Sequence, residues 1–547
     1  KELGLSVTTR IVRREYNLQE PWNTVLELST TLKNLTVESK TNGVQFAIAS
    51  SKNGIKASIT VEDGTKISGN YGVYMKGQPK PWRDTRDGQE ILNVNGGEIT
   101  GTTAAIAVFG AGKGNTKAGV IVNINGGKVY SDSYAIAGNG SSVLENTTIN
   151  ISGGKVFSNK DTAIYHPQAG TVTISGGEVY GVTGGVQMCA GTLNVTGGTI
   201  SATGNGDVSG KTGDGSIPDG AAVSIVNRAY PAGAPTMTIS GGTFTSADGV
   251  GAVQAYGWKN NSQQTWDKPN ASVSGGTFSS AVKEEYCATG YIPTANADGT
   301  FGVKEGVYVA KVDNVKYETL QAAIDAAKRN ATVTMLANTR ENVTISTPYL
   351  TLDLNGFTLN GGTEKGKPAL TVTARVTVKD SSEEHTGTIM REDTAANPGV
   401  SSHYVIDVQG GGWLTFESGT VKNNSGNANG KGASLVRVGD DRVAKYPGLN
   451  IKGGTFTQDN FIVIKVDSGD LFLNGGTLNS KNSYAIEDWH RATIKGGTVN
   501  GTVAAWTYSG GYSSSLEISG GTINGDVTSV NYGNADGKKA TVAITGG

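Results

Sequence analysis

A short phrase built around two adjacent glycines returns along most of this chain and restricts the folds open to it. The phrase reads Ile-Ser-Gly-Gly-Thr-Phe at 239–244, and related forms stand at 94–99, 151–156, 451–456 and 518–523. In the later copies the first glycine falls at 453, 475, 496, 520 and 546, so the repeat is a little over twenty residues long. A repeat of this length predicts a solenoid in which each copy forms one coil.

Apolar and polar residues alternate on both sides of the glycines, which is typical of strands. In the copy at 148–156, Ile149 and Ile151 share one strand face, and Val156 returns to that face after the corner. Glycine suits the corner because a Cβ atom would oppose its backbone angles. A third short strand follows each corner, as at 105–108, 135–137, 162–165 and 252–255. Three strands per coil predict a right-handed parallel β-helix.

Composition excludes several classes of function. The chain has 547 residues with 46 basic and 47 acidic side chains, so charge gives no case for binding nucleic acid or an anionic membrane. No apolar run approaches the roughly 20 residues that span a membrane. Cys189 and Cys287 are far apart, which favours free thiols over a disulfide. Because the chain starts at Lys1 and ends inside the phrase, at Gly546 and Gly547, we expect a piece of a longer protein with further modules.

The first solenoid is expected to occupy residues 1–304. Its coils are interrupted by longer excursions at 77–84, 203–220 and 258–269, which should form surface loops. The repeat stops after residue 280, and Asp298-Gly299 lies between two strand-like segments. This pattern predicts a hairpin that closes the exposed end of the solenoid.

The second solenoid is expected to occupy residues 305–547 and to be truncated at its C-terminus. It begins with the one convincing helix of the sequence, at about 317–328, where Leu320, Ala323 and Ile324 form one apolar stripe. Thr319 is the expected N-cap of this helix. The helix should cover the first coil. The fold class is therefore all-β, with two tandem right-handed parallel β-helices, the second capped by a short α-helix.

Several segments carry a resemblance to a known superfamily. The helix sequence at 319–325 resembles the N-terminal capping helix of pectate-lyase-like β-helices, which include polysaccharide lyases, glycoside hydrolases and phage tailspikes. Together with 352–356, 376–382, 298–300 and the Gly-Gly-Thr-Phe coils, it is similar to β-helix regions of large bacterial surface proteins of the adhesin type. The resemblance covers nearly the whole chain and implies the fold. It leaves function open, because this architecture hosts catalysis, attachment and plain spacing.

In the second solenoid, polar and aromatic residues follow the third strand of five successive coils. If the protein is an enzyme, Glu487 and Asp488 are the expected acid and base or nucleophile, because carboxylates on such a face can flank a glycosidic bond. An Asp beside Gly is more often turn chemistry, which is the simpler interpretation of the other acids. The set comprises Arg437, Asp440, Asp441, Lys465, Asp467, Glu487, Asp488, Trp489, His490, Trp506, Tyr508, Asn531 and Tyr532.

Aromatic rings on a polar face are the ordinary means of holding sugars. Loops also pack tryptophan back onto their own coils, so each ring has a structural alternative. His166 has the parity of an inward-facing residue and is expected to be a core histidine. The predicted ligand-binding residues are Trp489, His490, Trp506 and Tyr508 in the second solenoid, and Trp82, Tyr256 and Trp258 in the first.

No cofactor is expected, with calcium as the alternative. Asp207, Asp214 and Asp219 in the Gly-rich excursion are weak calcium candidates, since they lack the nonapeptide repeat of calcium-binding solenoids. The chain shows no phosphate loop, zinc spacing or serine triad.

The sequence favours a non-catalytic, extracellular protein of a bacterium or phage. It would act at the cell surface or in secreted form as a rigid stalk or adhesin with a glycan-binding face. Its partners would be glycans or other host or bacterial surface polymers. The alternatives are a polysaccharide-degrading enzyme of the β-helix type, either a glycoside hydrolase or a lyase, and a purely structural fibre or virion decoration.

Overall fold

The chain folds into strands with one short α-helix, arranged in two units. Unit 1 comprises Lys1–Gly306 and unit 2 comprises Val307–Gly547, whereas the sequence placed the boundary after residue 304. The computed structural model describes 58–77, 89–112, 119–140, 144–204, 215–361, 367–391, 404–423, 434–440, 447–459, 461–508, 511–533 and 537–547, and the backbone of β1 (Arg13–Glu15), β2 (Val25–Glu27), β3 (Leu35–Glu38) and β4 (Phe46–Ala49).

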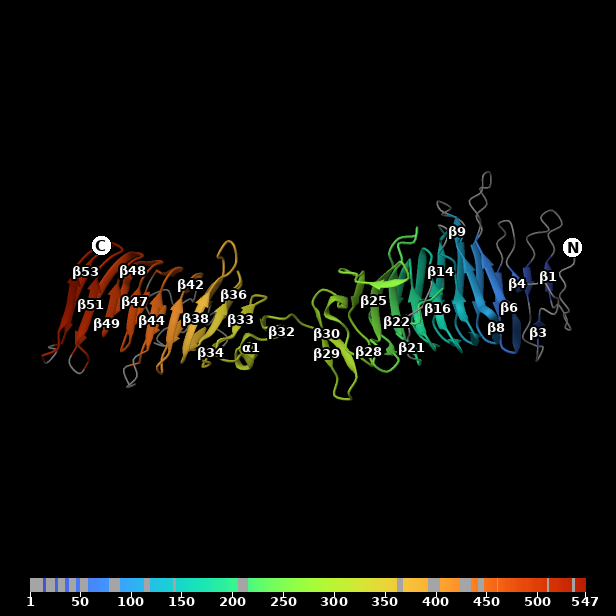
Figure 1. The fold of residues 1–547 in the computed structure, drawn as a ribbon, viewed down its shortest axis with the longest axis horizontal. Coiled ribbons are helices and arrows are strands. Elements are labelled where there is room, and N and C mark those ends of the chain that lie inside the picture. The colour runs from blue at the N-terminus through green and yellow to red at the C-terminus, as the bar shows by residue number, and fades with distance from the viewer. Residues whose placement is uncertain are drawn as a thin grey trace. The chain divides into compact units, whose positions relative to one another are not determined.

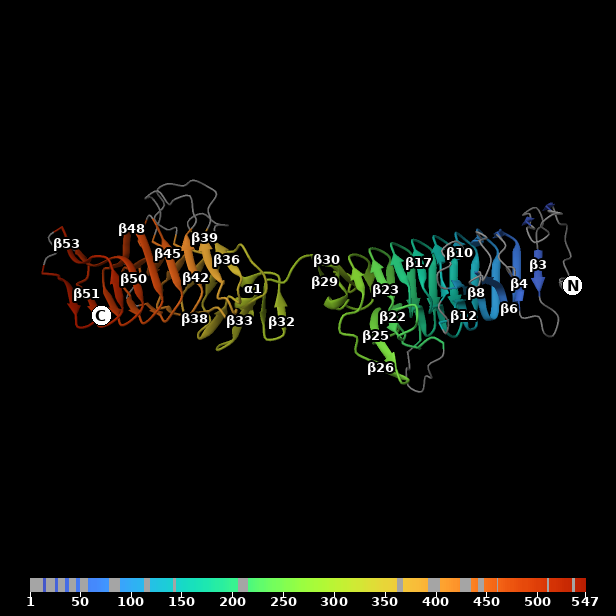
Figure 2. The same cartoon turned by 90° about the horizontal axis from the view of Figure 1, so that it is seen from above.

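Unit 1 is a parallel β-helix with three strands per coil, as the sequence predicted. Figures 1 and 2 show the strands of each sheet side by side along the unit. The first sheet holds β5 (Ser58–Val61), β7 (Gln89–Val94), β10 (Gly119–Ile124), β14 (Thr147–Ile151), β17 (Gly170–Ile174), β20 (Thr192–Val195), β23 (Thr236–Ile239) and β27 (Ala271–Val273).

The second and third sheets of unit 1 share two long strands, β6 (Thr65–Lys76) and β8 (Glu98–Phe109), that run from one sheet into the other. The second sheet continues with β11 (Lys128–Ser131), β15 (Lys155–Ser158), β18 (Glu178–Gly181), β21 (Thr199–Ala202), β24 (Thr243–Thr245) and β28 (Thr277–Phe278). The third continues with β12 (Tyr134–Ala137), β16 (Thr162–His166), β19 (Gly184–Met188), β22 (Val223–Asn227) and β25 (Val253–Lys259). Two short strands, β9 (Ala111–Gly112) and β13 (Leu144–Glu145), pair antiparallel with each other, and β26 (Ser262–Gln264) pairs antiparallel with β25.

The glycine corners join the first sheet to the second. In the copy that contains β14 and β15, Ile149, Ile151 and Val156 are all at most 1% exposed, which confirms that they share the inner face. Gly154 has a φ of +73°, and a Cβ atom on Gly153 would lie 2.3 Å from the Asn125 carbonyl oxygen of the preceding coil. The first glycine is therefore required for space and the second for its backbone conformation.

A hairpin closes unit 1, as the sequence predicted. Its strands β29 (Tyr291–Ala295) and β30 (Phe301–Glu305) are antiparallel, and β30 also pairs with β28 through Phe301 and Phe278. The turn is held by Asp298, whose Oδ1 accepts hydrogen bonds from the Thr300 amide at 3.0 Å and hydroxyl at 2.6 Å. A short 3-10 turn at Glu284–Tyr286 precedes the hairpin.

Unit 2 opens with the hairpin β31 (Ala310–Val312) and β32 (Val315–Tyr317), followed by helix α1 (Leu320–Ala326). The Thr319 hydroxyl accepts a hydrogen bond from the Ala322 amide at 3.2 Å, which confirms the predicted N-cap. The helix is shorter than the predicted 317–328, because Tyr317 pairs in β32 and Ala327 already has an extended backbone, with a φ of −71° and a ψ of 132°. In the part of the chain that the structure describes, no helix is long and apolar enough to cross a membrane.

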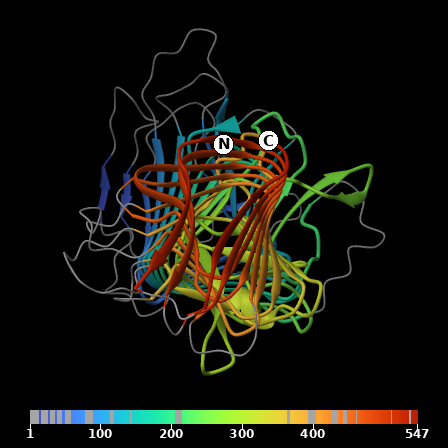
Figure 3. The same cartoon turned by 90° about the vertical axis from the view of Figure 1, so that its left-hand side faces the viewer.

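The rest of unit 2 is a second parallel β-helix. Figure 3 looks along it and shows its coils one behind another. Its first sheet holds β33 (Thr332–Met335), β35 (Leu350–Asp353), β38 (Arg375–Lys379), β41 (Trp413–Phe416), β44 (Gly448–Ile451), β47 (Asp470–Leu473), β49 (Arg491–Ile494), β51 (Ser514–Ile518) and β54 (Ala540–Ile544).

The other two sheets of unit 2 share the long strands β48 (Thr477–Asp488) and β50 (Thr498–Tyr508). The second sheet includes β36 (Thr358–Gly361), β39 (Thr388–Arg391), β42 (Thr420–Asn423), β45 (Thr455–Gln458) and β52 (Thr522–Asn524). The third includes β34 (Val343–Ile345), β37 (Leu370–Val372), β40 (Ile406–Val408), β43 (Val436–Val438), β46 (Ile464–Val466) and β53 (Val527–Tyr532).

Candidate functional site

The outer face of the third sheet in unit 2 carries a column of charged side chains. The register aligns Asp407, Arg437, Lys465 and Glu487 on the adjacent strands β40, β43, β46 and β48. Their strand neighbours, such as Val466, are completely buried, so the charged residues occupy the alternate, outer positions. Repetition of the coil thus places residues far apart in sequence beside one another.

The cations of this column are paired with carboxylates. Arg437 donates two hydrogen bonds to Asp407, Nε to Oδ1 at 2.9 Å and Nη2 to Oδ2 at 2.7 Å. Its guanidinium carbon also lies 4.5 Å from the centroid of the Tyr404 ring. Lys465 Nζ lies 3.0 Å from Asp467 Oδ1. Burial disfavours the charge of Arg437, but the Asp407 carboxylate outweighs burial and raises the pKa of Arg437, so the guanidinium stays charged.

An aromatic cluster lies beside the end of this column, on β48, β50 and β53 and at Trp489 directly after β48, while Ala504 follows Glu487 in the column itself. The rings of Trp489 and Trp506 lie with centroids 5.2 Å apart, and Tyr508 meets Trp489 edge-on at 5.3 Å. Tyr532 lies 6.4 Å from Trp506, and Tyr484 meets Trp506 edge-on at 5.7 Å. Tyr508 is 38% exposed and Tyr532 is 66% exposed, while the other three rings are half-buried. The structure therefore brings together Trp489, Trp506 and Tyr508, three of the predicted ligand-binding residues.

Glu487 connects the charged column to the aromatic cluster. Its Oε1 accepts a hydrogen bond from Trp489 Nε1 at 2.7 Å, which fixes the orientation of the indole. Burial raises the pKa of Glu487, and the Trp489 hydrogen bond and the nearby Lys465 oppose this rise. Glu487 is thus a positioning residue for the Trp489 ring.

Asp488 lies on the opposite side of the same strand. The register places it in the inner column after Val408, Val438 and Val466, and its side chain is completely buried. Its Oδ1 accepts a hydrogen bond from the His490 amide at 3.0 Å, and burial raises the pKa of Asp488 to about 8. The structure does not bring Glu487 and Asp488 together on one face, because neighbouring residues of a strand point to opposite sides. They cannot flank one glycosidic bond as the paired carboxylates of a glycosidase do.

His490 lies in the turn between the third and first sheets. Its Nδ1 lies 2.9 Å from the Gly469 carbonyl oxygen and 3.6 Å from Asp470 Oδ1, and its ring meets Tyr512 edge-on at 5.3 Å. Asp470 is also held by Arg491, whose Nε donates to Oδ1 at 2.7 Å. These contacts tie His490 to the turn.

In unit 1 the predicted ligand-binding rings are buried. Tyr256 is 3% exposed and Trp258 is 7% exposed, in a small cluster with Tyr165, Cys189 and Ile217. The expectation of exposed rings is wrong for these two residues, because the end of the 203–220 excursion packs over the third sheet. Trp82, the remaining predicted residue, lies outside the described residues.

The weak calcium candidates do not form a described site. Asp219 is 6% exposed and accepts hydrogen bonds from the Tyr256 hydroxyl at 2.7 Å and the Ala221 amide at 3.1 Å. Asp207, Asp214 and Asp441 lie outside the described residues. Over the described ranges, no group of three or more His, Cys, Asp or Glu side chains is placed to hold a metal ion.

Other single residues follow their sequence pattern. His166 is 1% exposed, which confirms its predicted inward position, and burial lowers its pKa to about 4. Cys189 and Cys287 are both free thiols, as expected. Burial raises the pKa of Cys189 to about 12, so its thiol stays protonated at neutral pH.

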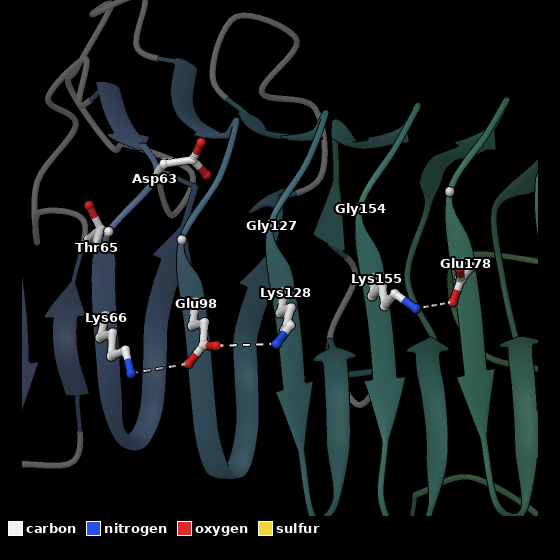
Figure 4. Close-up of a pocket in the computed structure, with 12 residues that line it drawn as sticks. Asp63, Thr65, Lys66, Glu98, Gly127, Lys128, Gly154, Lys155 and Glu178 are labelled. Carbon is white, nitrogen blue, oxygen red and sulfur yellow. Dashed lines mark hydrogen bonds and ion pairs between the residues drawn. The ribbon is translucent and has the colours of Figure 1, made fainter. Parts of the chain in front are cut away.

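Sequence reasoning missed a second charged column, on the second sheet of unit 1. Figure 4 shows its side chains among the residues that line a pocket over the glycine corners, whose lining also includes Gly97, Gly127 and Gly154. The signal was the residue directly after each Gly-Gly pair, which is charged in several successive copies. The column consists of Lys66, Glu98, Lys128, Lys155 and Glu178.

Comparisons with known proteins find only weak structural similarity. No protein-family model and no curated protein sequence matches the chain. Among solved structures, the PL6 family alginate lyase AlyGC aligns over 94% of this chain and 93% of its own, with 10% identity and a TM-score of 0.20. An arginine-to-alanine mutant of that lyase aligns over 93% of this chain and 96% of its own, with 11% identity and a TM-score of 0.21.

Proposed function

We propose that this chain is a non-catalytic, extracellular surface protein of a bacterium or phage that binds glycans. The supporting observation is the aromatic cluster of Trp489, Trp506, Tyr508 and Tyr532 beside the charged column on the third sheet of unit 2. A sugar ring presents apolar C–H faces to aromatic rings and hydroxyl groups to polar side chains. Here the aromatic rings and the polar side chains lie on the same sheet, which is the arrangement that a preorganised binding site needs.

The charges favour a neutral glycan over a polyuronate. Arg437 forms two hydrogen bonds to Asp407, and Lys465 pairs with Asp467, so each cation already has a carboxylate partner. Glu487 adds a third acid to the same face. Binding a carboxylated polymer would require these pairs to break or the polymer to approach acidic groups, and both cost free energy.

The placement of the acids supports the non-catalytic part of the proposal. Glu487 is hydrogen-bonded to an indole on the outer face, and Asp488 is completely buried on the inner face. A solenoid also suits a stalk, since coils that contact only their neighbours form an extended scaffold.

The proposal is tested by removing two rings of the cluster together, in the variant Trp489→Ala/Trp506→Ala. Losing two stacking rings should weaken binding to a neutral glycan by about 10-fold or more. Trp413→Ala is the matched control, because Trp413 is a half-buried outer residue on the first sheet of the same unit, stacked with Phe472.

Affinity electrophoresis against neutral glycans and uronates reports binding, and circular dichroism confirms that each variant is folded. Unchanged binding by the folded double variant would remove the cluster as the site. An equal loss of binding in Trp413→Ala would also remove the cluster as the site, because the loss would not be specific to the cluster. Tighter binding of a uronate than of every neutral glycan would contradict the assigned ligand class.

A further inference from the structure

The outer face of the second sheet in unit 1 carries two neighbouring columns, which together we call the ladder face. The first is the charged column of Lys66, Glu98, Lys128, Lys155 and Glu178, seen in Figure 4. The second stands two residues further along the same strands, so it points to the same side. It consists of Ser68, Thr100, Tyr130, Phe157 and Tyr180.

The charged column contributes little to the stability of the coils. Glu98 lies 3.9 Å from Lys66 and 3.4 Å from Lys128, and Lys155 lies 2.7 Å from Glu178. These side chains are between 31% and 59% exposed, and ion pairs in water at this exposure are worth little. Along five successive coils the charges run positive, negative, positive, positive, negative.

The second column changes from small to large along the same coils. Ser68 and Thr100 occupy the first two positions. Tyr130, Phe157 and Tyr180 occupy the last three and stack almost flat, with centroids 4.8 and 4.7 Å apart and ring planes within 5° of parallel. All three rings are half-buried, so part of an aromatic stack is exposed over three coils. The ladder face therefore carries small side chains at its N-terminal end and large side chains at its C-terminal end.

The order of charges and the order of side-chain sizes along the five coils each complement the same order in a second copy that runs in the opposite direction. A half-turn about an axis at the level of Lys128 and Tyr130 places the first coil of one copy against the fifth coil of another. Lys66 then faces Glu178, and Glu98 faces Lys155. The same half-turn lays Tyr180 over Ser68, and Phe157 over Thr100. Because coil spacing is the same in both copies, about 4.8 Å, all these pairs form together.

We propose that the ladder face binds a second copy of this chain in antiparallel orientation. The match of charge to charge and of large to small residues is what an isologous two-fold interface requires. Two residues meet their own copies on the axis, Lys128 and Tyr130. Each Lys128 already lies 3.4 Å from Glu98 of its own chain, and the two Tyr130 rings form an aromatic pair. The ladder face holds two acids against three bases, so it lacks the excess of charge that a polyelectrolyte partner would need.

The test is the mass of the whole chain by sedimentation over a range of protein concentrations. A dimer is expected, and it should weaken by 10-fold or more in Lys155→Glu, where two like charges then face each other. The exchange Glu98→Lys/Lys155→Glu should restore the dimer, because it swaps the charges of the facing pair. Lys452→Glu, which breaks an exposed pair with Glu417 at 3.1 Å in unit 2, is the matched control and should leave the dimer unchanged.

A cross-link locates the axis. With Cys287→Ser removing the partly exposed thiol, Lys128→Cys should form a disulfide between two copies, and Lys66→Cys should not. A single mass of one chain at every concentration would overturn the proposal. So would a dimer that survives Lys155→Glu, an exchange variant that stays monomeric while folded, or equal cross-linking at both positions.

Discussion

The two glycines of each corner satisfy different physical requirements. In the pair at 153 and 154, the first lacks room for a Cβ atom, and the second has a left-handed φ of +73°. The sequence predicted only the second requirement, a corner whose backbone angles favour glycine. The distinction appears only when neighbouring coils are stacked, because the atom that crowds Gly153 belongs to Asn125 in the preceding coil.

The second glycine of a corner should not accept alanine. In Gly154→Ala the new Cβ atom would lie 2.6 Å from the Gly126 carbonyl oxygen, and the residue would also adopt a strained φ. We expect a loss of about 2 to 4 kcal/mol in the free energy of unfolding, measured by urea denaturation of unit 1. Gly233→Ala is the control, since Gly233 has a φ of +89° but nothing within 4 Å of the added atom, and it should lose only about 1 to 2 kcal/mol. Equal losses would contradict the steric account.

The buried carboxyl of Asp488 should make stability depend on pH. Burial raises its pKa to about 8 in the folded chain, whereas an unfolded aspartate has a pKa of about 4. Between these values the folded state holds one more proton than the unfolded state, so stability falls as pH rises from about 4 to about 8.

Asp488→Val should remove this dependence, since valine occupies the same position in the three preceding coils. We expect the variant to gain about 3 to 4 kcal/mol more in unfolding free energy at pH 8 than at pH 5, measured by urea titration at both values. The lost hydrogen bond to the His490 amide affects both measurements alike. A gain that is the same at both pH values would show that Asp488 does not titrate in this range.

Strand parity explains why the candidate acids were grouped wrongly. Glu487 and Asp488 are adjacent in a strand, so one faces the solvent and the other faces the core. The sequence placed Trp489, Trp506 and Tyr508 on one edge, and the structure brings their rings together. It could not show that Tyr256 and Trp258 are covered, because the covering excursion belongs to another part of the chain.

At the scale of elements, the sequence predicted the capping helix but not the distant side chain that caps its N-terminus. Leu320, Ala323 and Ile324 are buried as their spacing indicates. The helix N-terminus is also capped by Glu341, whose carboxylate accepts hydrogen bonds from the Leu320 amide at 2.8 Å and the Gln321 amide at 3.1 Å. This partner comes from after the next strand, so a local capping pattern does not contain it.

Removing the Glu341 carboxylate should weaken the N-terminal end of unit 2. Glu341→Ala leaves two helix amides without their acceptor, and we expect a loss of about 1 to 3 kcal/mol in unfolding free energy. Glu341→Gln keeps one acceptor oxygen and should lose less. Thermal and urea denaturation of unit 2 measure both variants. A loss in Glu341→Gln as large as in Glu341→Ala would show that packing, and not hydrogen bonding, is the contribution of this side chain.

At the scale of the whole molecule, repetition made the fold readable from the sequence. Each coil repeats the same three strands and the same corner, so one correctly interpreted copy predicts its neighbours. The C-terminal end of unit 1 and the N-terminal end of unit 2 were visible for a related reason, since the hairpin at 291–305 and helix α1 interrupt the repeat. The side chains that face solvent do not have to repeat from coil to coil. One copy therefore does not predict the outer residues of the next, and the structure is needed to show which of them lie together.

The central claim is that the face around Trp489 and Trp506 binds neutral glycans without cleaving them. The most direct measurement is incubation of the whole chain with immobilised neutral glycans and with uronates, followed by assays of retained protein and of new reducing or unsaturated sugar ends. The account predicts retention on at least one neutral glycan and no new ends of either kind. Release of cleaved sugar would contradict it, and so would a failure to be retained on any neutral glycan.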